Sequence, residues 1–490
     1  MKKQLWIAAL VACVLMKSVP VHAETNSIDQ GISYHILIDR FNNGDVSLDE
    51  TVDVTDPLAY HGGDFKGIVK RLDALKELGI TTIVLSPPMA NADKGFHGYW
   101  IEDFMAVEPQ FGTMEDFKTL VNEAHDRDIN VIMEFVMNYA AKSHPLVKES
   151  PETTVENAVI DAPWKEGAVV LDQTNQQVKE MITEAALFWV QNTDVDGFKL
   201  HAADQTNQQF LQELTDQIKN ENDSFLLLAS VLDEEADLTP LLENNNLDVI
   251  DDPDIQNRLR AALAEPGQSL TPVIDATDST DKQRLLQADD FYTKRFSQLT
   301  AENGRNDLTS WKLALTYLYT APGLPNLTQG SEIPMYGDGW PETAKLVQFN
   351  RQDEDTLAFY EKIASIREQF PVLVDGAFTF VGDSGAMSVY KRTNDNQTVY
   401  VALNNDVKSQ VVSVEGLSDE QQLNGILGDN IVRQNEDGAF DLVLPRETAE
   451  VYIVEENTGL NWPFILFVGG VFLLFPIGII VMGRKAKKNN

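Results

Sequence analysis

The sequence predicts an α/β protein whose main part is a parallel sheet, followed by a small antiparallel β-domain. Three observations support this prediction. Over about 340 residues, short apolar segments alternate with amphipathic helical segments, as in proteins with a parallel sheet. From residue 372 the pattern changes to short alternating strands separated by Gly and Asn. Both ends of the chain are apolar segments that differ in composition from the rest.

The alternation favours either a closed (β/α)8 barrel or an open sheet. The predicted strands cover residues 34–41, 80–86, 129–136, 195–201, 224–231, 270–276 and 324–330, and the length leaves room for more. No glycine-rich phosphate loop follows the first strand, which disfavours a dinucleotide-binding sheet. In a barrel, functional residues are expected at the carboxyl ends of the strands.

The two ends predict export and membrane attachment. Residues 1–23 have a basic start, an apolar run and a small-residue cleavage site, so we expect a signal peptide. Residues 462–482 contain no charged residue, and a segment of this length can span a bilayer. A basic tail follows at 483–490. By the positive-inside rule, this predicts a single-pass cell-membrane protein with its body outside and its C-terminus in the cytoplasm.

The chain is strongly acidic, with 76 Asp and Glu against 38 Lys and Arg and a formal net charge of −38. The two apolar ends contribute seven basic residues and no acid, so the body between them carries a net −45. This charge excludes nucleic acid as a natural partner, because phosphates would be repelled. The single cysteine, Cys13, allows neither a disulfide framework nor a thiolate metal site.

Several motifs then occur in a fixed order along the chain. They are YHILIDRFNNGD (34–45), HGGDFKGIVKRLDALKELGIT (61–81), HGYWIEDF (97–104), FGTMEDFKTLVNEAH (111–125), DQTNQQV (172–178), DGFKL (196–200) and APGLPNLTQGSE (321–332). Together they resemble the α-amylase family, glycoside hydrolase family 13. The resemblance implies a (β/α)8 barrel over 24–370, a short inserted domain after the third strand at about 139–170, and a C-terminal β-domain over 372–455.

The resemblance also implies a catalytic site, but its key positions are replaced. The family's retaining mechanism uses one carboxylate as nucleophile, one carboxylic acid as proton donor and a third, stabilising carboxylate. The nucleophile position is His201, the nearby arginine position is Lys199, and the acid position is Ser230. Asp278, after the strand predicted at 270–276, is expected to be the retained third carboxylate.

These replacements predict a catalytically degenerate protein. A serine hydroxyl is too weak an acid to protonate a leaving group at neutral pH, and lysine lacks the planar fork of arginine. Loss of a nucleophile or acid removes several orders of magnitude of rate. We therefore expect a pseudoenzyme that binds an α-glucan or a protein partner.

Sugar and calcium sites are also implied. Tyr99 matches the family tyrosine that stacks on a sugar, with His97 and Trp100 beside it, although these rings could equally pack the rim. Asn138 matches a family calcium ligand. Asn43 and Asp45 offer oxygen ligands suited to calcium, although such a run is also typical of a turn.

Two other functions stay open from the sequence. The first is an active α-glucan hydrolase or transferase that uses non-standard residues, for example Asp278 with Glu134 as an inverting pair. The second is an amylase-like accessory subunit of a membrane complex.

Overall fold

The computed structural model describes residues 31–156, 158, 160–278, 283–457, 470–472 and 475. Eight parallel strands close into a barrel in the order β1-β12-β11-β10-β9-β8-β5-β2. They are β1 (Ser33–Ile36), β2 (Thr82–Leu85), β5 (Asn130–Val136), β8 (Gly197–His201), β9 (Leu226–Ala229), β10 (Val249–Asp251), β11 (Gln283–Leu286) and β12 (Leu324–Thr328). The closed barrel confirms one of the two sheet forms that the sequence left open and excludes the open sheet.

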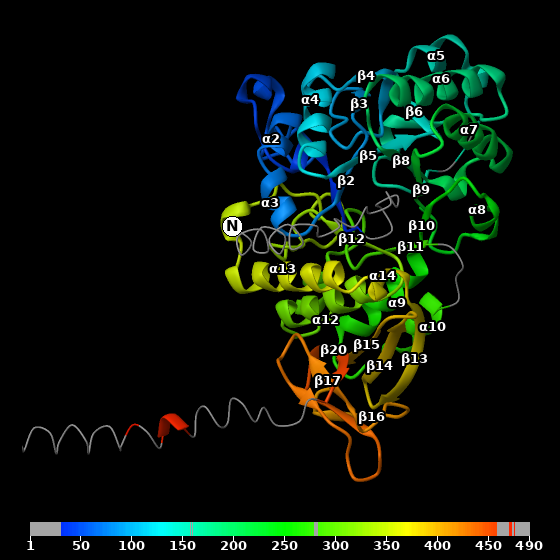
Figure 1. The fold of residues 1–490 in the computed structure, drawn as a ribbon. Helices are drawn as coiled ribbons and strands as arrows, with labels where there is room; N and C mark the ends of the chain where they lie inside the picture. Colours follow the sequence, from blue (N-terminus) through cyan, green and yellow to red (C-terminus); the bar gives the residue numbers. More distant parts are fainter. Residues whose placement is uncertain are drawn as a thin grey trace, which may run out of the picture.

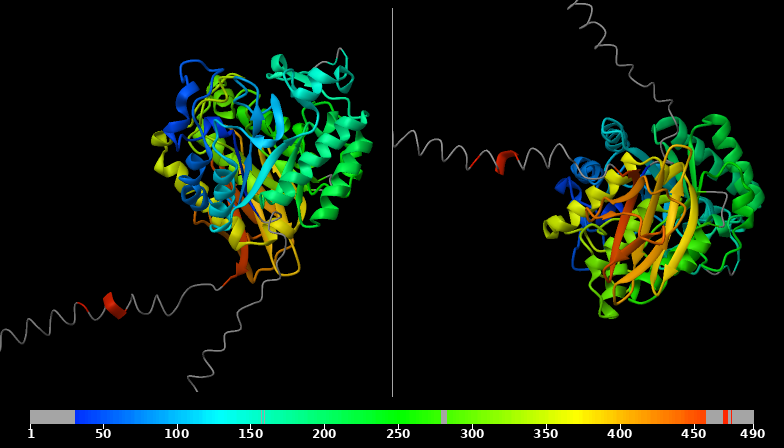
Figure 2. Two further views of the ribbon diagram at one scale, coloured as in Figure 1. Left: turned by 90° about the horizontal axis from the view of Figure 1, so that it is seen from above. Right: turned by 60° about the horizontal axis from the view of Figure 1, so that its bottom comes forward.

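Helices surround the barrel, as the view from above shows (Figure 2). The principal ones are α2 (Phe65–Val69), α3 (Leu72–Glu77), α4 (Met114–His125), α6 (Gln176–Asn192), α7 (Gln208–Glu221), α8 (Thr239–Glu243), α9 (Pro253–Ala264), α10 (Thr271–Asp278), α11 (Phe296–Glu302), α12 (Asp307–Thr320) and α13 (Glu354–Gln369). Their starts follow local chemistry. Thr113 and Asp116 form a capping box at α4, and the side chains of Asn175, Asn207 and Asn306 cap α6, α7 and α12.

The strand predicted at 270–276 is wrong, because these residues belong to helix α10. Pro272 lacks the amide N–H that a central strand would need, but it is tolerated in the first turn of a helix. Val273, Ile274 and Thr277 are buried with the spacing of one helical face. The seventh barrel strand is instead β11, which lies further along the chain.

The segment at 139–170, predicted as an inserted domain, is short and shares the core of the barrel. Strands β6 (Tyr139–Ala141) and β7 (Ala168–Val170) pair antiparallel, with helix α5 (Pro145–Glu149) between them in the chain. Tyr139, Trp164 and Ala168 belong to the same hydrophobic cluster as the barrel residues. The segment therefore has no separate core among the residues that the structure describes.

The C-terminal part is an antiparallel β-domain below helices α12 and α13 (Figure 1). Six strands form one sheet, in the order β13-β14-β15-β20-β17-β18, and β16 pairs with β19. The strands are β13 (Ala377–Ser384), β14 (Met387–Thr393), β15 (Thr398–Asn404), β16 (Gln410–Val414), β17 (Gln421–Gly425), β18 (Ile431–Val432), β19 (Phe440–Leu444) and β20 (Thr448–Glu456). The predicted antiparallel domain is confirmed.

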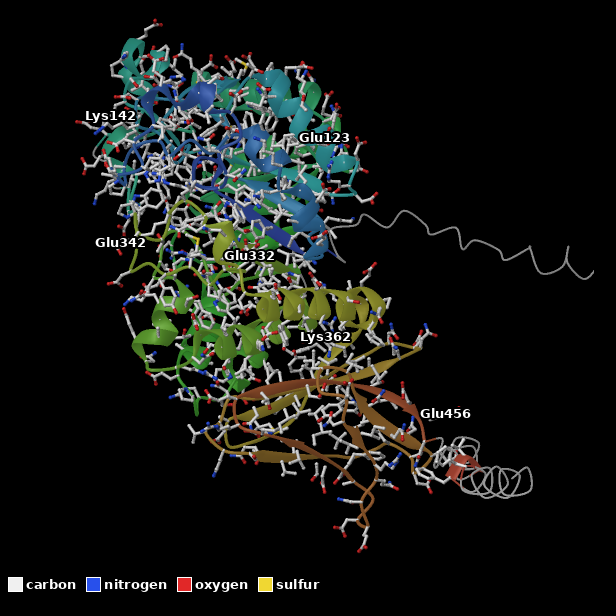
Figure 3. All side chains as sticks on the ribbon, turned by 90° about the vertical axis from the view of Figure 1, so that its left-hand side faces the viewer. Glu123, Lys142, Glu332, Glu342, Lys362 and Glu456 are labelled. Carbon is white, nitrogen blue, oxygen red and sulfur yellow. The ribbon has the colours of Figure 1, made fainter. Side chains whose placement is uncertain are left out.

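Polar side chains join this domain to the barrel, one of them buried and one exposed. Asn405 donates from Nδ2 to the carbonyl oxygens of Ala262, Glu265 and Gln268, at 2.8–3.0 Å. Lys362 of α13, labelled in Figure 3, donates to the carbonyl oxygen of Leu427 at 2.9 Å. The two parts are thus connected by specific hydrogen bonds as well as by apolar packing.

The predicted cell-membrane location requires correction. No helix in the described part of the chain is long and apolar enough to cross a membrane. Within the predicted span at 462–482, the structure describes only helical residues 470–472 and 475. The predicted signal peptide at 1–23 and the tail at 483–490 lie outside the described residues.

Replacing Arg392 tests the junction of the two parts. Its buried guanidinium donates to the carbonyl oxygens of Gly376, Thr320 and Val374 at 2.9–3.0 Å. Arg392→Met leaves these oxygens without their donor, so we expect the free energy of unfolding in urea to fall by about 3 kcal/mol. Arg433→Met changes an exposed arginine and should alter it by about 0.5 kcal/mol or less. Equal effects of the two substitutions would contradict the structural role of Arg392.

Candidate functional site

The alternation of side chains along the barrel strands places polar residues at one end of the barrel. On four strands, a buried apolar residue is followed two positions later by a polar one on the same face. These pairs are Ile132 and Glu134, Leu228 and Ser230, Val249 and Asp251, and Leu285 and Gln287. The four apolar residues belong to one small buried cluster, and the four polar residues line a cavity at the carboxyl ends of the strands.

His201 and Glu134 form the centre of this site. Nδ1 of His201 donates to Oε1 of Glu134 at 2.6 Å, and both residues are 1% exposed. The hydroxyl of Tyr99 donates to the same carboxylate at 3.1–3.2 Å. Nε2 of His35 lies 3.7 Å from it. His201, which the resemblance places at the nucleophile position, is therefore held by a buried hydrogen bond to Glu134.

The buried environment changes the titration of these groups. Burial alone would raise the pKa of Glu134, but the neighbouring His201 and His35 hold it well below its usual range. Burial, assisted by the charge of Lys199, lowers the pKa of His35 to about 4. Glu134 is thus a carboxylate and His35 a neutral imidazole at pH 7.

An aromatic stack covers this pair. The ring of Trp164 lies on the ring of Tyr99, with centroids 4.1 Å apart, and its edge meets His201 at 5.3 Å. The hydroxyls of Tyr99 and Tyr292 are in contact. Trp164 and Tyr99 are both buried, so the Tyr99 ring, which the resemblance assigned to a sugar, stacks on a protein side chain.

The other two residues predicted to contact sugar support this stack. Nδ1 of His97 accepts the backbone N–H of Tyr99 at 3.0 Å, and the two rings are stacked. Nε1 of Trp100 donates to the carbonyl oxygen of Trp164 at 2.6 Å. A Cβ at Gly167 would come within 2.2 Å of the Trp100 ring, so only glycine fits there. His97 and Trp100 therefore hold Tyr99 and Trp164 in place.

Asp278 is not at the position predicted for the third carboxylate, because it ends helix α10. The carboxylates that follow the seventh strand are Asp289 and Asp290, and Asp290 lines the cavity. Asp290 is already heavily engaged. It accepts hydrogen bonds from the backbone of Tyr292 and Thr293, the Thr293 hydroxyl and Gln256, at 2.5–2.7 Å.

These contacts fix the loop that contains Asp290, Tyr292 and Thr293. Burial would raise its pKa, but Arg260, whose NH1 lies 3.9 Å away, and the hydrogen bonds from Thr293 lower the pKa overall. Both carboxylate oxygens have donors within the protein, so neither is left free for a sugar hydroxyl.

Lys199, Ser230 and Asp251 line a cavity of about 100 Å³ beside the stack. Lys199 is 6% exposed, and no carboxylate among the described residues lies within 4.0 Å of its Nζ. Oδ1 of Asp251 accepts from Nε2 of Gln287 at 3.2 Å. Burial, with a contribution from Asp290, raises the pKa of Asp251 to about 6. The cavity thus contains one ammonium group and one carboxyl group that titrates near neutral pH.

The residues predicted to bind calcium are engaged in protein hydrogen bonds. Oδ1 of Asn138 accepts from Gln173 at 3.2 Å and Thr206 at 2.9 Å, so Asn138 does not fit a cation. Asp45 accepts from Ser47 and pairs with Lys66 at 2.7 Å, and Asn43 donates to Asp49 at 2.9 Å. Over the described ranges, no group of three His, Cys, Asp or Glu residues could hold a metal ion. Calcium at Asn43 and Asp45 stays a prediction.

The sequence did not identify Trp164, Asp251, Asp290 or Tyr292 as site residues. A signal for Asp290 was present, since two leucines followed by paired aspartates at 285–290 are typical of a short buried strand and its end. Trp164 gave no local signal, because its partner Tyr99 is distant in the sequence.

The fold and the site define a (β/α)8-barrel protein with a polar site at the strand carboxyl ends and an antiparallel C-terminal β-domain. The family model for the alpha amylase catalytic domain matches residues 35–167. The model for the alpha-amylase C-terminal domain matches residues 376–452.

Solved structures and curated proteins agree with these matches. An Anoxybacillus α-amylase is 35% identical with a TM-score of 0.83, and the match covers 89% of this chain and 100% of that chain. The Geobacillus thermoleovorans α-amylase, solved with acarbose, is 36% identical with a TM-score of 0.80, covering 88% and 99%. A cyclomaltodextrinase of Thermoanaerobacter pseudethanolicus is 27% identical, covering 79% of this chain and 72% of its own length. The chain belongs to the α-amylase family, glycoside hydrolase family 13.

The titration of His35 gives a testable pH dependence. The pKa of His35 is about 4 in the folded protein, compared with 6.5 for an ordinary histidine. Between pH 6.5 and pH 4, the unfolded chain therefore binds a proton at His35 that the folded protein does not bind. Stability is therefore lost as the pH falls from 6.5 towards 4. We expect His35→Gln to reduce the loss between pH 7 and pH 5 by about 2 kcal/mol in urea unfolding.

Thr82→Val is a suitable control, because it changes a buried, non-titrating side chain on the neighbouring strand β2. It should leave the pH dependence unchanged. The same pH dependence in His35→Gln and the unmodified protein would contradict a buried neutral His35.

Proposed function

We propose that this protein is a non-catalytic member of the α-amylase family that recognises a carbohydrate without hydrolysing it. The observation that carries the proposal is the buried His201–Glu134 pair beneath the stack of Trp164 and Tyr99. Retaining hydrolysis needs a carboxylate that reaches the anomeric carbon and an acid that protonates the leaving oxygen. His201 is not a carboxylate and is enclosed, and Ser230 is too weak an acid.

Two observations support a carbohydrate ligand. Relatives are named for glucan-active enzymes, and one of them is solved with acarbose. The cavity lining also combines hydroxyl, amide, ammonium and carboxyl groups, which bind sugar hydroxyls without any chemistry. An α-glucan ligand is therefore part of the proposal. The protein partner expected from the sequence stays a prediction.

A second candidate function is hydrolysis through non-standard residues, and Asp251 favours it. A carboxyl group with a pKa of about 6 could donate a proton near neutral pH. The pair of Asp278 and Glu134 is not favoured, because Asp278 belongs to α10 and Glu134 is bonded to His201 and Tyr99.

Turnover assays test the main proposal. We expect the purified protein to release no sugar from maltooligosaccharides or starch, at least about 10⁴-fold below the Geobacillus thermoleovorans α-amylase as positive control. Restoring the family residues by His201→Asp, Ser230→Glu and Lys199→Arg should not suffice, because Trp164 still covers Tyr99. Adding Trp164→Gly should uncover the Tyr99 face and give measurable hydrolysis. Turnover by the unmodified protein would overturn the proposal.

Asp251→Asn separates the two candidate functions. Because the folded-state pKa of Asp251 is raised from 3.8 to about 6, its ionisation costs stability as the pH rises through 6. The substitution should therefore raise the free energy of unfolding by about 2–3 kcal/mol at pH 7, with little gain at pH 4. Sugar release should stay at background. Activity in the unmodified protein that Asp251→Asn abolishes would instead favour the second candidate.

A further inference from the structure

We propose that Trp340 is a second contact site for the α-glucan, beside the cavity at the ends of β8, β9, β10 and β11. Trp340 holds the part of the sugar chain that extends out of the cavity, so this inference rests on the proposed function. The indole ring stacks on a glucose unit, and its N–H donates to a sugar hydroxyl.

Trp340 lies at the same end of the barrel as the cavity. It belongs to the loop between β12 and η7 (Phe349–Arg351), and β12 is the last barrel strand along the chain. Loops at the carboxyl ends of the strands form the ligand sites of such barrels. Tyr292 connects Trp340 to the cavity, because it lines the cavity and its ring centroid lies 6.2 Å from that of Trp340. Trp340 is therefore separated from the cavity by one side chain.

One face of the indole ring is packed against protein. The Phe96 ring is nearly parallel to it, with an angle of 5° between the planes and 5.5 Å between the centroids. Phe96 is itself buried, and the guanidinium carbon of Arg40 lies 3.8 Å from its ring centroid. Trp340 is only partly buried, so the rest of its ring stays at the surface. A rigid aromatic ring of this kind gives a large contact area at a low cost in conformational entropy.

Hydrogen bonds on both sides of Trp340 fix its loop to the loop that follows β11, which also supplies the cavity tyrosine. The backbone N–H of Arg295 donates to the carbonyl oxygen of Gly337 at 2.9 Å. The buried hydroxyl of Thr343 donates to the carbonyl oxygen of Phe291. The two aromatic rings therefore keep a fixed spacing before a ligand binds, and such preorganisation lowers the cost of binding.

The indole N–H of Trp340 is free to donate to a ligand. Its Nε1 has no hydrogen-bond partner among the described residues and is not one of their buried unpartnered atoms, so it reaches the surface. By contrast, the indole N–H groups of Trp100, Trp189 and Trp311 donate to protein oxygens at 2.6–2.9 Å. A glucose unit has C–H groups on its faces and hydroxyls around its edge. A partly exposed ring with a free donor at its own edge matches both features.

Isothermal titration calorimetry with maltoheptaose and glucose tests this inference on the unmodified protein. We expect saturable binding of maltoheptaose. Trp340→Ala removes the stacking ring and its donor, so it should weaken maltoheptaose binding about tenfold or more. Glucose is a single ring and cannot occupy the cavity and the Trp340 face together. The affinity advantage of maltoheptaose over glucose should therefore shrink in this variant.

Two further variants make the test specific. Trp340→Phe keeps a ring against Phe96 but loses the N–H, so it should weaken maltoheptaose binding only about threefold. This variant keeps the test valid if Trp340→Ala does not fold. Tyr336 is 44% exposed in the same loop and has no ring contact in the described part of the chain. Tyr336→Ala should therefore leave binding unchanged.

Saturable maltoheptaose binding that is unchanged in both Trp340 variants, or weakened equally by Tyr336→Ala, overturns this inference and leaves the proposed function intact. Absence of maltoheptaose binding to the unmodified protein overturns both. Hydrolysis of maltoheptaose, with a KM that rises in Trp340→Ala but not in Tyr336→Ala, would be the failure of the non-catalytic function alone.

Discussion

The buried hydrogen bond between His201 and Glu134 determines what this end of the barrel can do. A carboxylate that is 1% exposed persists as an anion only if donors satisfy it, and His201 and Tyr99 supply them. These donors fix the orientation of the imidazole and phenol rings, and Trp164 packs against both. The closure of the site therefore depends on one buried hydrogen bond, and opening the site would expose Glu134 or leave it without its donors.

The fold tolerates this rearrangement because the barrel and its site depend on different residues. Stability of the strands rests on inward apolar side chains such as Ile132, Leu228 and Leu285, one layer below the site. Replacing a carboxylate by His201 or Ser230 leaves that layer unchanged. Residues at the site can therefore differ while the layer that stabilises the barrel is kept, and the fold alone does not define activity.

The sequence predicted those parts of the structure whose signals are local. Long apolar strands such as β5 and β8 were located, and motifs on them identified Lys199 and His201. Strands β10 and β11 were missed, because they have three and four residues and β11 begins with polar ones. The residues of helix α10 have an apolar pattern like that of a strand. The third carboxylate was therefore predicted at Asp278, although the carboxylate that follows the seventh strand and lines the cavity is Asp290. Trp164 stacks on Tyr99, which lies far away in the sequence. No local sequence pattern predicts such a contact.

Several buried acids near the site have cationic or hydrogen-bonding partners. Asp289 pairs with Arg295 at 2.7 Å, Glu134 with His201 at 2.6 Å, and Asp290 lies near Arg260. Asp251 receives one hydrogen bond from Gln287 and has no ion pair in the described structure, and its pKa rises to about 6. An unpaired buried carboxylate is stabilised most by any donor that reaches it. A donor that reaches the carboxylate of Asp251 would therefore stabilise its ionised form and lower its pKa.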